Sequence, residues 1–274
     1  MRNAIIAGSF AGVLAVGTVG AAATAVEEGT AELSVLHGIP GLTVDVYVNG
    51  DLTLDDFAPG DLAGPLVLDP GTYTVAITAA DAEDDSAPVL GPIDLPLEDG
   101  NSYTAAAHLD ADGGATATLF TNDISELAEG EGRLTVRHIA AAPATDVWAD
   151  GAVLFEDLTN PNEVMGDVPV ATYAAAVSLA DTETVVLGPA DVALAADTNT
   201  IVYAWGSAAD ENLALAIQTV ATAAGDVEAS PSEEAPEEEV EEEEESGFPW
   251  LVVLGVGAVV VAIVLASSMS GNRK

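Results

Sequence analysis

A block of sequence that occurs twice, about one domain length apart, constrains this chain more than any other feature. Residues 33–37 read Leu-Ser-Val-Leu-His, and residues 134–138 read Leu-Thr-Val-Arg-His. Residues 44–50, Val-Asp-Val-Tyr-Val-Asn-Gly, return as Thr-Asp-Val-Trp-Ala-Asp-Gly at 145–151, with the same offset of 101 residues. A period near 100 is too long for a solenoid unit, so we expect each copy to form one complete domain.

Within each copy the segments are short and have the period of β-strands. Val44, Val46 and Val48 alternate with polar residues, which is the pattern of a half-buried strand. Asn49-Gly50 then supplies residues that tolerate the positive φ angles of a tight hairpin. Such segments recur seven or eight times per copy, with no sustained helical period. The sequence therefore predicts an all-β protein with two tandem immunoglobulin-like antiparallel β-sandwiches, at residues 31–122 and 132–220.

The first 25 residues have the three parts of a secretory signal. Arg2 is followed by an apolar run that closes on the small-residue site Ala23-Thr24-Ala25. We predict a cleaved signal peptide over residues 1–25, with an uncleaved N-terminal anchor as the alternative.

The C-terminal part predicts a membrane anchor. Residues 248–269 form an uncharged stretch of 22 residues, close to the ~20 needed to cross a bilayer. Trp250 at one edge and the basic residues of the tail, residues 270–274, indicate a single-pass helix with the N-terminal bulk outside the cell membrane. Residues 226–246 contain 12 acidic residues, which predicts a disordered stalk, or alternatively a tail that recruits a basic partner or cations.

Acidic residues greatly outnumber basic residues in this chain. There are 46 acidic residues against five lysines and arginines, and only Arg133 and Arg137 lie between the two apolar segments. Such a surface repels nucleic acid, because phosphate contacts need lysine and arginine, so nucleic-acid binding is excluded as a function. The chain has no cysteine, which excludes thiol catalysis and cysteine-ligated zinc.

The repeated motifs resemble a known family. Residues 134–138, followed by Ala-Ala-Ala-Pro at 140–143 and Asp-Val-Trp at 146–148, are similar to the opening motif of the domain-of-unknown-function 4397 family. The Gly-Thr-Tyr strand at 71–73 and the Ser-Tyr-Thr strand at 102–104 extend the resemblance. It implies an exported surface protein of bacteria or archaea with sandwich-like domains, and no enzyme activity. The first copy departs from the usual first loop, since it reads Gly-Ile-Pro-Gly at 38–41.

Two histidines occupy equivalent positions in the copies and are the first candidates for chemistry. His37 and His138 each precede an aspartate, Asp45 and Asp146, by eight residues. A His–Asp pair could act as a metal ligand or general base, but no nucleophile motif accompanies it and each domain has too few histidines for a zinc site. We favour the alternative, a histidine that fixes the first loop through a hydrogen bond.

Three further features have both a structural and a functional interpretation. Asp110 opens a segment that imitates a calcium loop, but the twelfth position is Thr121 and not glutamate, so we favour a hairpin turn. Residues 81–85 form an acidic loop that could hold a hard cation, although a solvated loop is favoured. Tyr47 and Trp148 share a repeat position and could stack on sugars, but packing at the domain interface or a sheet edge is favoured.

These patterns predict a non-enzymatic cell-surface module for adhesion, ligand binding or envelope scaffolding. We expect no catalytic residue, no cofactor site and no metal site, and an envelope polymer or surface protein as the partner. The alternatives are a hydrolase of envelope polysaccharide or peptidoglycan, which would need a carboxylate pair in a cleft, and a cation-binding surface protein.

Overall fold

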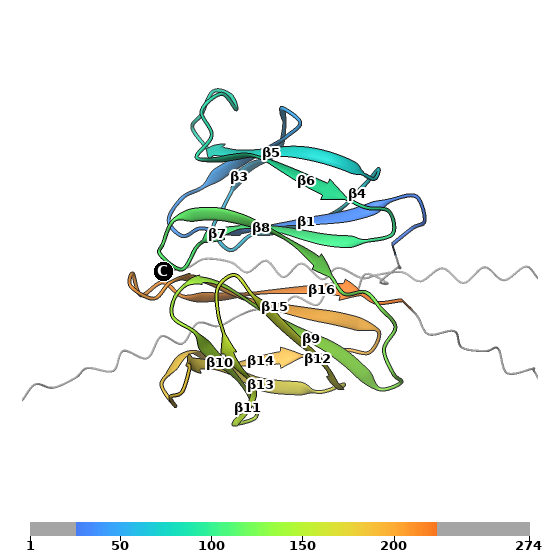
Figure 1. Ribbon diagram of the computed structural model, residues 1–274, viewed down its shortest axis with the longest axis vertical. Coiled ribbons are helices and arrows are strands. Elements are labelled where there is room, and N and C mark those ends of the chain that lie inside the picture. The colour runs from blue at the N-terminus through green and yellow to red at the C-terminus, as the bar shows by residue number, and fades with distance from the viewer. Residues whose placement is uncertain (1–25, 224–274) are drawn as a thin grey trace, which may run out of the picture. The chain divides into compact units, whose positions relative to one another are not determined.

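The computed structural model describes residues 26–223, and this part of the chain is built of β-strands (Figure 1). The strands of the first half are β1 (Ala31–Gly38), β2 (Val44–Val48), β3 (Asp51–Phe57), β4 (Leu62–Leu68), β5 (Gly71–Ala79), β6 (Leu90–Leu97), β7 (Ser102–Leu109) and β8 (Ala115–Asn122). Those of the second half are β9 (Glu131–Ala141), β10 (Thr145–Ala149), β11 (Ala152–Leu158), β12 (Glu163–Pro169), β13 (Thr172–Leu179), β14 (Val185–Ala193), β15 (Thr198–Ser207) and β16 (Ala214–Ala221).

The sixteen strands form four four-stranded sheets, in two similar pairs. In the first half, β4-β1-β7-β8 packs on β3-β2-β5-β6. The second half repeats this order as β12-β9-β15-β16 and β11-β10-β13-β14. The all-β prediction and the two tandem sandwich-like units are therefore confirmed.

Tight hairpins form where the sequence predicts them. β2 and β3 are joined by Asn49 and Gly50, whose φ angles are 53° and 86°. Asp150 and Gly151, with φ angles of 50° and 80°, make the same connection between β10 and β11. Two successive positive φ angles match the right-handed twist of the flanking strands, which is why Asn-Gly and Asp-Gly occur here.

The strand pairing differs from the prediction in one respect. The first and seventh strands of each unit are parallel neighbours at the centre of a sheet, so the pairing is not purely antiparallel. The order also differs from the immunoglobulin arrangement, in which the first two strands share a sheet. Here β1 and β2 lie in different sheets, because residues 39–43 cross from one sheet to the other instead of forming a hairpin.

Each sandwich has its own apolar core, and a third cluster joins the two. Leu33, Val35 and Val46 belong to the first core, and Leu134 and Val202 to the second. Side chains on the opposite faces of the β1-containing and β9-containing sheets form the third cluster, whose buried members are Leu36, Ala106, Phe120, Ile139, Ile201, Tyr203 and Val220. Figure 1 shows these two sheets as adjacent layers. The central strands are therefore covered on both faces.

Several predictions fall on residues outside the described range. They concern the signal peptide at 1–25, the stalk at 226–246, the membrane helix at 248–269 and the tail at 270–274. Residues 26–223 contain no helix that could cross a bilayer.

Candidate functional site

His37, the first of the two histidines at equivalent repeat positions, lies at the end of β1 and is buried. Its Nε2 donates to the carbonyl oxygen of Leu42 at 2.7 Å, and its ring stacks on Phe57 with centroids 5.9 Å apart. Nδ1 is buried and has no hydrogen-bond partner among residues 26–223. His37 therefore holds the crossover between the two sheets, and burial lowers the pKa of its imidazole.

His138 makes the equivalent contact in the second sandwich. Its Nε2 donates to the carbonyl oxygen of Pro143 at 3.0 Å, and its Nδ1 accepts from the amide of Ala140 at 3.3 Å. Both ring nitrogens are thus engaged in the neutral form, and burial lowers the pKa of this imidazole as well. The favoured interpretation, a histidine that fixes the first loop, describes what the structure shows at both positions.

The two aspartates bind backbone amides and make no hydrogen bond with the histidines. Oδ1 of Asp45 accepts from the amide of Asp56 at 2.9 Å, and Oδ1 of Asp146 accepts from the amide of Asp157 at 3.0 Å. Asp56 and Asp157 both have positive φ angles, at shifts in the strand register. These buried carboxylates therefore stabilise irregular points of β3 and β11, and the geometry does not form the His–Asp pair considered from the sequence.

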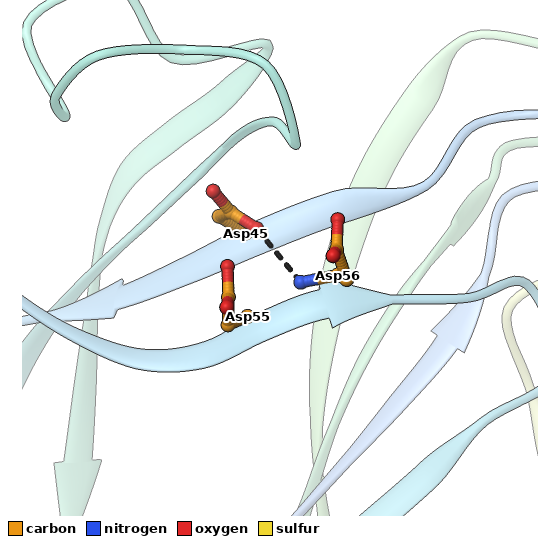
Figure 2. A group of neighbouring side chains, drawn as sticks. All are labelled: Asp45, Asp55 and Asp56. Atoms are coloured by element: carbon orange, nitrogen blue, oxygen red, sulfur yellow. Dashed lines mark hydrogen bonds between the residues drawn. The ribbon is translucent and has the colours of Figure 1, made fainter.

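Asp45 belongs to a group of three carboxylates, with Asp55 and Asp56 (Figure 2). One oxygen from each lies within 4.8 Å of the others. Carboxylate oxygens are the ligands that Ca²⁺ and Mg²⁺ prefer. This group was not predicted from the sequence, although Asp45 was a candidate, because the three carboxylates are brought together only by the pairing of β2 with β3.

Tyr47 lies beside this group and is buried. Burial raises the pKa of its phenol, and the nearby carboxylates of Asp45, Asp85, Asp84 and Asp55 raise it further. The acidic loop at 81–85 thus approaches the same region. A buried ring cannot present its face to a sugar, so the stacking function considered for this position finds no support in the geometry at Tyr47.

The other two sequence candidates have structural roles. Trp148 donates from Nε1 to the hydroxyl of Ser178 on the neighbouring strand at 2.8 Å, and it is half-buried on a sheet that does not join the two sandwiches. Oδ1 of Asp110 accepts from the amides of Asp112 and Gly114 at 2.9 and 2.8 Å, which closes the β7–β8 turn. Asp110 therefore forms the expected hairpin turn. Trp148 lies at neither the domain interface nor a sheet edge, and it contacts β13 instead.

A further buried group, which was not among the candidates from the sequence, is centred on an arginine. Arg137 on β9 is fully buried, and its Nε lies 2.7 Å from Oε2 of Glu163. Its Nη1 donates to Oδ1 of Asn122 at 3.0 Å and to the hydroxyl of Tyr203 at 2.7 Å. The guanidinium stacks 4.3 Å from the ring centroid of Phe120. Because Asn122 and Phe120 belong to the first sandwich, Arg137 links the two units.

A difference between the two repeats indicates this ion pair. Arg137 and Glu163 are cross-strand neighbours, and the first sandwich pairs Leu36 with Leu62 at the same place. Both substitutions occur at the same offset of 101 residues. A leucine pair replaced by opposite charges indicates a salt bridge across two strands.

The second arginine of this region fixes the connection between the sandwiches. Arg133 binds Asp167 through Nε at 2.8 Å and Asp123 through Nη1 at 2.7 Å. It also donates to the hydroxyl of Ser125 at 3.0 Å. The hydrogen bond to Asp167 raises the pKa of the Arg133 guanidinium above its ordinary value. Both arginines are therefore engaged internally, and the surface of residues 26–223 displays carboxylates without an exposed lysine or arginine.

Residues 31–147 match a family described as a domain of unknown function, DUF4397. The match includes the whole first sandwich and continues through β9 into β10. No curated protein matches the chain. The family description names no activity.

Proposed function

We propose that this chain is a non-enzymatic surface module, in which two fused β-sandwiches are exported and held at the outer face of the cell membrane for contact with an envelope polymer or another surface protein. The observation that carries the proposal is the buried junction between the sandwiches. A rigid two-domain body presents its outer faces in a constant geometry, which suits display and scaffolding.

The junction has the character of a domain core. The apolar cluster around Leu36 and Tyr203 surrounds a set of hydrogen-bonded polar groups. Thr104 of the first sandwich donates to Oε1 of Gln218 of the second at 3.0 Å, and Tyr203 donates to the same oxygen at 2.6 Å. Buried polar groups that are satisfied across a junction favour one relative orientation over others.

The histidines support a non-enzymatic function. His37 and His138 are buried and donate to backbone carbonyls within their own loops. A general base must reach the proton that it removes from a substrate, and neither ring is accessible to one. The acidic surface suits a saline or cation-rich exterior, where counterions screen its self-repulsion.

The export and display part of the proposal is tested in intact cells that express the full chain. We expect an antibody raised against the chain to label cells without permeabilisation, and added protease to remove that signal while the C-terminal region stays with the membrane fraction. Labelling that requires permeabilisation would contradict the proposal. Screening the purified chain on peptidoglycan fragments and chromogenic glycosides tests the hydrolase alternative, which turnover surviving further purification would establish.

A second candidate function is the binding of a divalent cation by the first sandwich. Asp45 is only 4% exposed, and no hydrogen bond from the described residues reaches its Oδ2. In the second sandwich the equivalent oxygen of Asp146 accepts from the amide of Asp181 at 3.1 Å. A carboxylate oxygen that no backbone amide occupies is available to a hard cation, and Asp55 and Asp56 would supply further oxygen ligands.

Melting of the full chain at 1 M sodium chloride tests this candidate, because surface repulsion is then screened. A cation site predicts that millimolar calcium raises the melting temperature further and that Asp55→Asn removes the effect. Glu156→Gln, at the matching position of the second sandwich, should leave it intact. Equal responses of the two variants, or no response of the parent chain, would reject a site at Asp45.

A further inference from the structure

The two sandwiches differ in the space between their sheets. The first encloses a cavity of about 210 Å³, lined by Leu33, Val46, Leu54, Val75, Ile77 and other apolar side chains. The corresponding cavity of the second sandwich is about 30 Å³. A volume near 30 Å³ is about one water molecule's share of the liquid, whereas the larger one can hold an organic molecule.

Two alanines on the β1-containing sheet explain most of this difference. The strand registers place Ala105 of β7 opposite Val35, as Val202 of β15 stands opposite Val136. On the adjacent strand, Ala117 pairs with Ala107, as Leu215 pairs with Ala204. Val202 and Leu215 fill the second sandwich, and the alanines leave the same volume open in the first.

Larger side chains on the facing sheet of the first sandwich fill only part of the volume that the alanines leave open. Val75 pairs with Val48 in the first sandwich, and Ala175 pairs with Ala149 at the same place in the second. Ile77 of the first sandwich likewise occupies the position of Val177 in the second. These larger side chains narrow the space without closing it. The cavity is therefore a property of the first sandwich as a whole, and not a defect at one residue.

The apolar lining of the cavity determines which class of molecule can bind in it. Apart from Asp51 and Thr53, which are exposed at the start of β3 and mark the opening, the lining side chains are buried or half-buried, and nearly all of them are apolar. A cavity of about 150 Å³ with a similar apolar lining binds benzene or xenon and excludes water. A carboxylate ligand would meet Asp51 and no exposed arginine or lysine of the described residues.

We propose that the first sandwich binds a small, uncharged apolar molecule, about the size of a substituted benzene, between its two sheets. Binding replaces the contacts that the side chains of Val202 and Leu215 make in the second sandwich. The second sandwich has no such site. This assignment does not depend on the surface function proposed above.

Methyl-resolved NMR of the full chain, titrated with toluene, tests the proposal. We expect saturable ring-current shifts of methyl resonances from Leu33, Val46 and Ile77, and unchanged resonances from Val136 and Val147 of the second sandwich. Benzoate, which has a similar shape with a negative charge, should cause no such shifts. No saturable shift, equal shifts in both sandwiches, or equal responses to toluene and benzoate would overturn the proposal.

Reciprocal substitutions move the site between the sandwiches. Ala105→Val with Ala117→Leu should abolish the toluene shifts and raise the melting temperature, because the added carbons fill the cavity. Val202→Ala with Leu215→Ala should create toluene shifts at Val136 and Val147. The second pair keeps the test decisive if the first pair fails to fold. Toluene shifts that persist in the filled variant, or that fail to appear in the emptied one, would contradict the assigned cavity.

Discussion

Replacing Arg137 with leucine tests whether its buried ion pair stabilises the junction. The substitution removes the 2.7 Å contact with Glu163, the hydrogen bonds to Asn122 and Tyr203, and the stacking on Phe120. Breaking a buried ion pair by removing one partner costs about 3–5 kcal/mol, because a charge is left without its counter-charge.

The structure places the expected cost near the lower limit of that range. The side chain of Glu163 is 26% exposed, so water can solvate its carboxylate after the arginine is lost. Asn122 keeps the hydrogen bond that its Nδ2 donates to the hydroxyl of Ser102, and Tyr203 keeps its hydrogen bond to Gln218. We expect a loss of about 3 kcal/mol in the free energy of unfolding. For a chain region of this size that corresponds to a fall of roughly 6–12 °C in melting temperature.

The double variant Arg137→Leu/Glu163→Leu provides the decisive control. It restores the leucine pair that the first sandwich has at Leu36 and Leu62. Replacing both charges with apolar groups removes the uncompensated carboxylate, so the double variant should recover most of the lost stability. The assay is urea unfolding of the full chain and its three variants, including Glu163→Leu alone. Additive losses in the double variant would refute the argument from an unpaired charge, as would a loss below about 1 kcal/mol for Arg137→Leu.

Three further predictions concern conditions and backbone. The melting temperature should rise between 0.01 M and 1 M sodium chloride, as the Debye length falls from ~30 Å to ~3 Å and the 34 carboxylates of the described region cease to repel one another; a calorimetric melting temperature independent of salt would contradict this. His37, His108 and His138 have lowered pKa values in the folded protein because of burial, so the unfolded chain binds more protons as the pH falls through about 6.5. The contribution of these histidines to the free energy of unfolding is therefore fully present well above pH 6.5 and is lost as the pH falls. The free energy of unfolding should decrease between pH 7 and 5.5 by at most about 1.4 kcal/mol per pH unit for each histidine; equal urea midpoints at the two pH values would exclude the effect. Gly50→Ala should cost about 1–2 kcal/mol, since φ is 86° there and no atom lies close enough to clash with a methyl group, whereas Gly71→Ala, at a negative φ, is the control and should cost less in the same unfolding assay.

Local features of the fold were predictable from the sequence. The Asn49-Gly50 and Asp150-Gly151 hairpins depend on the conformational preferences of two residues, and the structure has both. The turn at Asp110 depends on contacts within five residues. The positions of His37 and His138 beside their own loops are equally local, which is why their structural interpretation could be reached without coordinates.

Some features that were not predicted had a detectable signal. Residues 102–109 are a nearly continuous run of apolar and small side chains, which indicates a strand covered on both faces. Such a run predicts that β7 packs on a second layer as well as on its own core. The paired exchange of Leu36 and Leu62 for Arg137 and Glu163 was likewise visible in the aligned repeats.

The sequence by itself determined the duplication, the β-strand content, the hairpin turns and the excess of acidic residues. Each of these follows from composition or from residues close together in the chain. Tertiary structure alone decided the parallel pairing of β1 with β7, the burial of Arg137, the carboxylate group at Asp45 and the cavity of the first sandwich. Each of these depends on strands that are brought together by the fold, and on the volumes that facing side chains leave between them. Two copies with nearly the same pattern can therefore share one topology and differ in the space that they enclose.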